Sequence, residues 1–283
     1  MLSAEAQSRP SVTPLSRDLA AWMALFQKEE IPVLAATAEA LEAVRANEDD
    51  IDARAIGELT SADPLMTLKV LVYAAAHRSA ALTADVQSVT AAVMLMGTSP
   101  FFNAFGAQPT VEARLDGHPE ALAGLHQVVR RSHRSARFAL AFAVHRNDHD
   151  AALIHQAALL HDFAEMLLYC HAPLAAVEVV ELQRRDATLR SRAAQQHVLG
   201  AELQTVQQQL MLAWKLPSLL TRIAGDRDAL HAGAMSVALG VRIARHSSGS
   251  WCNPALPDDV TAAASLLNLS ESAVLGLLHE IDF

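Results

Sequence analysis

Apolar residues recur at helical spacing along most of the chain, and this pattern excludes most fold classes. Leu19, Met23 and Phe26 form an early set, and Val274 and Leu277 form the last one. Spacings of three and four residues place side chains on one face of a helix, whereas a half-buried strand needs alternation. We find no convincing alternation, and the low aromatic content of 5% also favours packed helices. The sequence therefore predicts an all-α fold.

Local signals predict where several helices begin and end. Asp63-Pro64 combines a side-chain acceptor with a proline at the first helical position, where its missing N–H costs nothing. Ser88 and Ser270 are further predicted N-caps, and Gly97 is a predicted helix end. A long helix is expected from Pro119 to about Arg146.

Two later stretches are also expected to be continuous helices. Residues 151–169 carry the adjacent pair His161 and Asp162, which is the most chemically suggestive feature of the chain. A further helix is expected to open at Asp186 and to extend to Trp214. The pair would then lie in the middle of a packed helix.

The predicted domain organisation has three parts. Residues 1–16, rich in serine, proline and threonine, are expected to form a flexible arm. Residues 17–115 are expected to form an N-terminal helical lobe. Residues 116–283 are expected to form a second lobe with a C-terminal helical extension. The boundary is placed in the irregular stretch 106–117.

Composition narrows the setting and the partners. A formal net charge of −9 argues against nucleic-acid binding, which needs a basic surface. The two cysteines, Cys170 and Cys252, are too few for a disulfide framework and suit a reducing compartment. No apolar run approaches the roughly 18 residues of a membrane span, and the N-terminus lacks a signal pattern. We therefore expect a soluble, cytoplasmic protein without a membrane partner.

Short motifs in a fixed order resemble the HDOD family, the catalytically degenerate relatives of HD-domain phosphohydrolases in bacterial signalling. The resemblance covers about Ile31 to Pro217 and departs from the family at Ala75, where an asparagine is usual. The motifs are Ile31-Pro32, Ser61-Ala62-Asp63-Pro64-Leu65, Val86-Gln87-Ser88-Val89, Ala92-Val93-Met94-Leu95-Met96-Gly97, His133-Arg134-Ser135-Ala136, Ala158-Leu159-Leu160-His161-Asp162-Phe163 and the stretch from His197 to Pro217.

This resemblance implies an architecture and a role. It implies a two-lobed helical bundle, in which a five-helix N-terminal lobe packs on a distorted HD-like lobe, here residues 116–283. It also implies a regulatory role, often downstream of a sensor or receiver domain. No such domain is recognised within these 283 residues, so the input is expected to arrive in trans or through the arm.

The resemblance also indicates a candidate metal site. Active HD enzymes use a first histidine, an adjacent His-Asp pair and a late aspartate, and His133, His161 and Asp162 match the first three. Two histidines and one carboxylate can hold a divalent transition metal, with water in the open positions. The late aspartate is replaced by Gly240, which offers no ligand.

A second departure concerns the residues after the pair. In the active phosphodiesterases of the HD-GYP type that this chain resembles, a Gly-Lys sequence follows the pair. This chain has Ala164-Glu165 there. Glu165 reverses the charge of the phosphate-binding lysine and would repel an anionic substrate. No catalytic residue is therefore assigned. In the alternative interpretation, His161 and Asp162 form a hydrogen-bonded polar cluster in the core.

Arginines supply the remaining candidate site. Arg130, Arg134 and Arg137 share a face of the predicted long helix and could receive a nucleotide phosphate or an acidic partner. The alternative is a solvated helix face. A second basic cluster contains Arg184, Arg185, Arg190 and Arg192.

The leading hypothesis is a non-enzymatic bacterial signalling module that acts through contacts with a signalling protein not identified by the sequence. One alternative is a divergent metal-dependent phosphohydrolase with His133, His161 and Asp162 as ligands. The other is a sensor that binds a nucleotide without cleaving it, through the stripe that contains Arg130, Arg134 and Arg137.

Overall fold

In the part of the chain that can be described, the regular secondary structure is helical and no strand is formed, which confirms the expected all-α class. The predicted arm, residues 1–16, lies outside that part. The computed structural model describes residues 17–46, 51–77, 88–186, 188–223 and 232–282.

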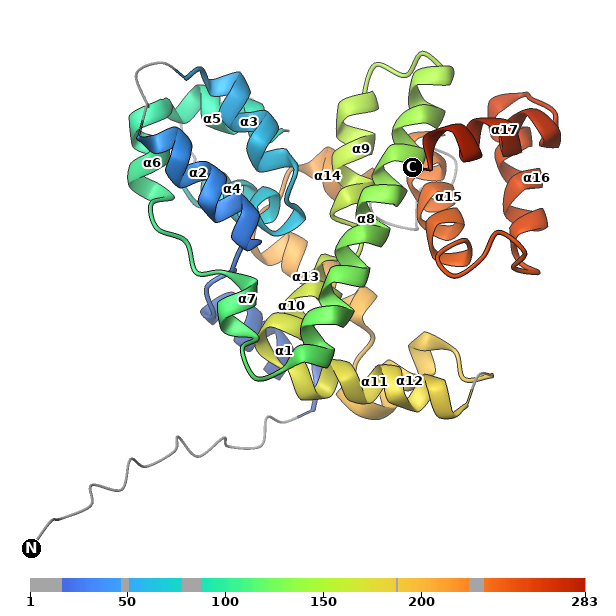
Figure 1. Ribbon diagram of the computed structural model, residues 1–283, viewed down its shortest axis with the longest axis horizontal. Coiled ribbons are helices and arrows are strands. Elements are labelled where there is room, and N and C mark those ends of the chain that lie inside the picture. Colours follow the sequence, from blue (N-terminus) through green and yellow to red (C-terminus); the bar gives the residue numbers. More distant parts are fainter. Residues whose placement is uncertain (1–16, 47–50, 78–87, 187, 224–231, 283) are drawn as a thin grey trace, which may run out of the picture.

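Figure 1 shows the helices in chain order. The first half contains α1 (Leu19–Lys28), α2 (Ala35–Arg45), α3 (Ala53–Ser61), α4 (Pro64–Ala76), α5 (Val89–Met96), α6 (Thr98–Ala104) and α7 (Val111–Arg114). The second half contains α8 (Pro119–His145), α9 (Ala151–Leu159), α10 (Phe163–His171), α11 (Pro173–Arg185), α12 (Ser191–Leu199), α13 (Leu203–Ala213), α14 (Ser218–Ile223), α15 (Ala232–His246), α16 (Leu256–Leu267) and α17 (Glu271–Ile281).

Helix ends follow the local signals of the sequence. The side chain of Asp63 accepts hydrogen bonds from two backbone N–H groups in the first turn of α4, and Pro64 is the first residue of that helix. Ser88 caps α5 and Ser270 caps α17 in the same way. Gly97 ends α5 with a φ of 83°, a backbone conformation that favours glycine. These predictions are confirmed.

The expected continuous helix over 151–169 is wrong, because the chain breaks between α9 and α10. His161 and Asp162 lie at this break, not inside a helix. Gln207 of α13 accepts a hydrogen bond from Ala164 N at 3.3 Å and donates one to the His161 carbonyl at 2.6 Å. A side chain distant in sequence thus satisfies backbone groups freed by the break.

The expected helix from Asp186 to Trp214 is also wrong, because it is divided into α12 and α13. Gly200 follows α12 with a φ of 66°. A Cβ atom at this position would collide with the backbone carbonyl of Arg17. The break therefore lets the N-terminal segment approach the end of α12 closely, which only glycine permits.

The long helix α8 organises the packing. It contacts α9, α10, α11, α15 and α17, and it runs through the centre of the molecule in Figure 1. One hydrophobic cluster extends from Trp22 to Val241 and includes helices of both predicted lobes. A second cluster joins Phe138 and Phe142 of α8 to α15, α16 and α17. Both faces of α8 are thus buried.

The first helix packs against the second half of the chain. Helix α1 contacts α10 and α13, and Trp22 Nε1 donates a hydrogen bond to the Leu199 carbonyl at 2.8 Å. An isolated parallel bridge joins Val33 to Thr110 and links the segments before α2 and α7. The first hydrophobic cluster contains residues from both sides of the predicted boundary after residue 115, so this cluster does not divide the chain there. The division into two lobes stays a prediction.

Within the described ranges, no single helix is both long and apolar enough to cross a bilayer. Two helix pairs, bent by 116° and 101°, pass a length and composition test only when each pair is taken together.

Candidate functional site

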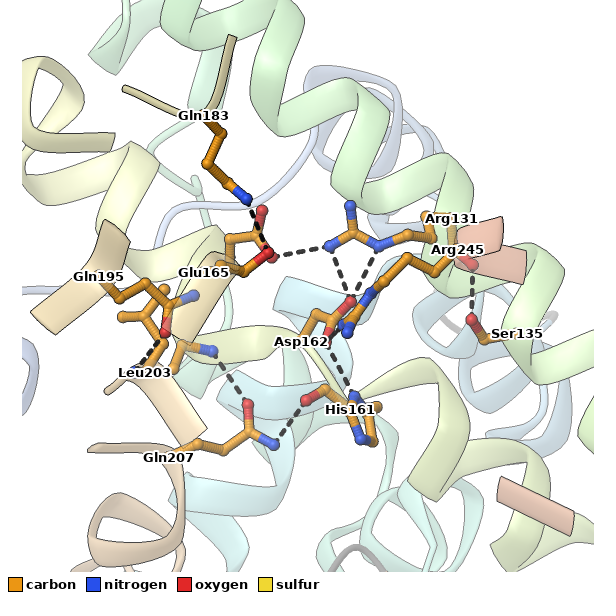
Figure 2. Close-up of polar contacts among 12 residues, drawn as sticks. Arg131, Ser135, His161, Asp162, Glu165, Gln183, Gln195, Leu203, Gln207 and Arg245 are labelled. Atoms are coloured by element: carbon orange, nitrogen blue, oxygen red, sulfur yellow. Dashed lines mark hydrogen bonds and ion pairs between the residues drawn. The ribbon is translucent and has the colours of Figure 1, made fainter. Parts of the chain in front are cut away.

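The candidate site is built around the break between α9 and α10. The break places His161 and Asp162 beside α8 and α15, which contribute Arg131 and Arg245 (Figure 2). Glu165 lies in the first turn of α10, on the same side as Asp162. Three segments distant in the sequence therefore meet here, because α8 packs on α9, α10 and α15.

Asp162 is the centre of this ion-pair network, and its side chain is only 10% exposed. Arg131 donates to Asp162 Oδ2 from Nε at 3.0 Å and from Nη2 at 2.8 Å. The same Nη2 lies 2.7 Å from Glu165 Oε2. His161 Nδ1 lies 2.8 Å from Asp162 Oδ1, and Arg245 Nη2 reaches that oxygen at 3.3 Å. Figure 2 shows these contacts converging on one carboxylate.

Burial and charge act in opposite directions on these groups. Burial by itself would raise the pKa of Asp162, but Arg131, His161 and Arg245 hold that pKa well below its usual range. Burial raises the pKa of Glu165, and neighbouring Asp162 raises it further against the opposing effect of Arg131. Burial would lower the pKa of Arg131, but Glu165 and Asp162 raise it above the ordinary value. Arg131, His161 and Arg245 together therefore favour the ionised form of Asp162.

The low pKa of Asp162 predicts a loss of stability in acid. A carboxyl whose pKa is depressed by folding stabilises the protein above its unfolded value of 3.8, and this contribution is lost as the pH falls through the folded value. The Asp162→Asn variant should be less stable than the wild type at pH 7, and its unfolding free energy should fall less steeply below pH about 4. Urea denaturation between about pH 7 and pH 3 measures both effects.

Glu165→Gln serves as the control for this prediction. The pKa of Glu165 in the wild type is shifted in the opposite direction, upward. The contribution of Glu165 to stability is therefore present below the unfolded value of 4.5 and is lost as the pH rises through the folded value. If the free energy of unfolding fell equally steeply with decreasing pH in the wild type and in Asp162→Asn, the acid response could not be assigned to Asp162.

The third predicted metal ligand has a different environment. His133 follows Arg131 by two residues on α8, so the two side chains point to nearly opposite sides of the helix. Burial and Arg137 lower the pKa of His133, and His133 in turn contributes to the lowered pKa of His155 on α9. His155, which is outside the predicted ligand set, is therefore an electrostatic neighbour of His133.

The donor set does not fit a divalent cation in this arrangement. Two guanidinium groups, from Arg131 and Arg245, are directed at the Asp162 carboxylate where a metal would need its lone pairs. Over the described ranges, no group of three or more His, Cys, Asp or Glu side chains could hold a metal ion. The ligand set His133, His161 and Asp162 stays a prediction that elemental analysis can test.

Gly240 is explained by packing. It is buried in α15, where that helix crosses α8. A Cβ atom there would lie 2.8 Å from the Ser135 carbonyl oxygen and 3.0 Å from Ala139 N. The position that would carry the late aspartate thus faces the backbone of α8, and a side chain has no room there.

The predicted arginine stripe is divided among different environments. Arg134 forms a bidentate ion pair with Asp282, at 2.6 and 2.7 Å, and donates to Ser247 Oγ at 2.8 Å. It therefore anchors the C-terminal end of the chain to α8. Arg130 is exposed and Arg137 is partly buried. Ligand binding by this stripe stays a prediction.

Sequence reasoning did not select the arginines that reach the site. Neither Arg131 nor Arg245 belongs to the arginine stripe that the sequence predicts. The one available signal for Arg131 was its place on the predicted long helix, directly after Arg130 and therefore on a different face from the stripe. For Arg245 no local signal exists, because its partner is 83 residues away in the sequence.

Two adjoining cavities open beside the network. The first has a volume of about 320 Å³, lies between α10, α12, α13 and α15, and is lined by His161, Asp162 and Arg245. The second has a volume of about 250 Å³, lies between α8, α10, α11 and α12, and is lined by Arg131 and Arg245. The predicted site residues His133, Arg130, Arg134 and Arg137 line neither cavity.

The helical architecture with a His-Asp pair at a helix break defines a protein of the HD-like class. A sequence profile of the HDOD domain matches residues 31–228, and the chain belongs to the HDOD family. A comparison with curated protein sequences found no match.

Solved structures share the fold. The MmoQ response regulator from Methylococcus capsulatus str. Bath superposes with a TM-score of 0.64 at 20% identity, over 89% of this chain and 98% of that one. A virulence factor from Campylobacter jejuni subsp. jejuni superposes with a TM-score of 0.61 at 18% identity, over 90% of this chain and 92% of that one. At these identities the similarity shows the fold alone.

Proposed function

We propose that this protein is a regulatory module of the HDOD type that signals through contacts with a partner protein and does not hydrolyse phosphate esters. One observation carries the proposal: Arg131 and Arg245 are paired with the carboxylate of the His-Asp pair. A hydrolytic HD site would use that carboxylate to hold a metal and activate water. Here it serves an internal ion-pair network.

Two further observations support the proposal. Glu165 lies where an active phosphodiesterase would have a phosphate-binding lysine, and it is itself paired with Arg131 at 2.7 Å. One protein with a similar fold is described as a response regulator, a class that transmits signals. Function is argued here from the site, and the similarity of fold only agrees with it.

An activity and metal assay tests the hydrolytic half of the proposal. The protein, purified without chelators, is incubated with nucleoside triphosphates and cyclic dinucleotides in the presence of manganese, iron or nickel. We expect no turnover and no stoichiometric transition metal in elemental analysis. Turnover that His161→Ala abolishes would overturn the proposal and support the divergent phosphohydrolase with His133, His161 and Asp162 as ligands.

A pull-down tests the signalling half. The full chain is used as bait, with Arg131→Met, shown by circular dichroism to be folded under the conditions of the assay, as a variant in which the network is broken. We expect a specific protein to be retained by the wild type and to be retained differently by the variant, because the network joins α8, α10 and α15. Failure to retain any protein reproducibly would contradict partner contacts as the output.

A further inference from the structure

The two cavities share one arginine. Arg245 lines both, together with Glu165 and Gln195, so it stands at the junction of about 320 Å³ and about 250 Å³ of space. Together these volumes are in the range of sites for small organic molecules. The ligand that such a site accepts is set by the groups that line it.

In the first cavity, the positively charged side chains are more exposed than the negatively charged ones with which they are paired. Three arginines line it, and each is paired with a carboxylate that is more buried than the arginine. The exposed fractions of the side chains are 68% for Arg192 against 31% for Glu202, 50% for Arg242 against 0% for Asp259, and 49% for Arg245 against 10% for Asp162. Each guanidinium group is therefore more accessible to a molecule entering from solvent than the carboxylate with which it is paired.

One of these arginines, Arg245, is a second cation for its carboxylate, because Asp162 is also paired with Arg131. Asp162 keeps both hydrogen bonds from Arg131 and the contact with His161 when Arg245, at 3.3 Å, turns away. Arg245 can thus turn to an anion without leaving Asp162 unpaired, which removes the main cost of breaking that internal ion pair. Asp259 is fully buried and has one neighbour on each oxygen: Arg242 on Oδ1, and His246, whose Nδ1 lies 2.5 Å from Oδ2. Arg242 is 50% exposed, so its guanidinium can contact an anion in the cavity while it stays beside the buried Asp259.

We propose that the first cavity binds a small organic anion through Arg242 and Arg245. The ligand is a molecule with a phosphate or carboxylate group, because the planar guanidinium fork matches both oxyanions in a bidentate way. The side chains of Gln204 and Gln208 line the same cavity and supply amide donors and acceptors for the rest of the molecule. This inference rests on the proposed function and gives the regulatory module a ligand input distinct from the stripe of Arg130, Arg134 and Arg137.

Binding without chemistry is the direct test. Isothermal titration is carried out with inorganic phosphate, AMP and citrate as anionic probes and with adenosine as a neutral control. We expect at least one anion to bind the wild type, adenosine not to bind, and Kd to rise at least tenfold in the double variant Arg242→Gln/Arg245→Gln. The affinity should also weaken with added salt. AMP and citrate distinguish a phosphate from a carboxylate ligand.

Arg54→Gln is the matched control, since Arg54 is a 76% exposed, ion-paired arginine on α3 that lines neither cavity. Its Kd should equal that of the wild type. Circular dichroism and thermal unfolding establish that the double variant is folded before its affinity is compared. Absence of binding by every anion, or equal affinity in the double variant, would overturn the site.

The two proposals can fail separately. Anion binding followed by turnover of AMP would overturn the non-hydrolytic function and leave the binding site standing. Absence of anion binding together with absence of turnover would overturn the binding site and leave the non-hydrolytic function standing.

Discussion

Replacing Gly240 with aspartate is expected to destabilise the protein strongly and not to restore a metal site. The new Cβ would lie 2.8 Å from the Ser135 carbonyl oxygen at the crossing of α15 and α8. Overpacking of this kind costs about 1–3 kcal/mol, and burial of an unpaired carboxylate adds several kcal/mol more. We expect a loss of more than about 3 kcal/mol in the free energy of unfolding, measured by urea denaturation.

Two alanine variants separate backbone crowding from charge. Gly240→Ala introduces only the crowded Cβ and should lose about 1–3 kcal/mol. Gly276→Ala places the same methyl group in the middle of α17, where nothing lies within 4 Å, and should be neutral or stabilising. A Gly240→Asp protein that is as stable as the wild type and binds stoichiometric manganese would contradict this account of the position.

Replacing Arg131 with methionine is expected to be the most damaging change within the ion-pair network. Arg131 is 17% exposed and neutralises both Asp162, which is 10% exposed, and Glu165, which is 28% exposed. Removing one partner of a buried ion pair costs about 3–5 kcal/mol when the remaining charge is left without compensation. In this variant Glu165 loses its ion pair at 2.7 Å, and Asp162 keeps only His161 and the longer contact with Arg245 at 3.3 Å. The partial exposure of Glu165 lowers the expected loss toward the lower end of that range. Chemical denaturation at neutral pH measures it.

Two controls accompany this prediction: a surface arginine variant and a triple variant in which the unpaired charges are also removed. Arg54→Met removes an arginine that is paired with Glu58 at 2.9 Å on the surface, and no measurable change is expected. Combining Arg131→Met with Asp162→Asn and Glu165→Gln should recover much of the lost stability, since the unpaired charges are removed with their partner. Equal stability of Arg131→Met and wild type would show that the network contributes nothing to the fold.

Helix chemistry was readable from the sequence wherever it depends on neighbours along the chain. Asp63, Ser88 and Ser270 cap the helices that they were expected to cap, and Gly97 ends α5. Each case involves a side chain and backbone groups within a few residues, so the local sequence contains both partners. The all-α class follows from the sum of such local preferences and the spacing of apolar residues.

The errors have a common physical cause. The breaks at His161-Asp162 and at Gly200 depend on Gln207 and on the Arg17 backbone, which lie 46 and 183 residues away in the sequence. A helical pattern continues through both breaks, so periodicity could not reveal them. Long-range contacts override local propensity when they satisfy the freed backbone groups or fill the space.

In the candidate site, too, some residues could be identified from the local sequence and others only from long-range packing. The adjacent pair of His161 and Asp162 was visible as a motif, and the absence of a ligand at Gly240 could be read by comparison with the family pattern. The packing of α8 against α10 and α15 then selected Arg131 and Arg245 as the partners of the carboxylate. Adjacent side chains identify a chemical group, whereas its charge state depends on which distant helices bring their charges within about 3 Å of it.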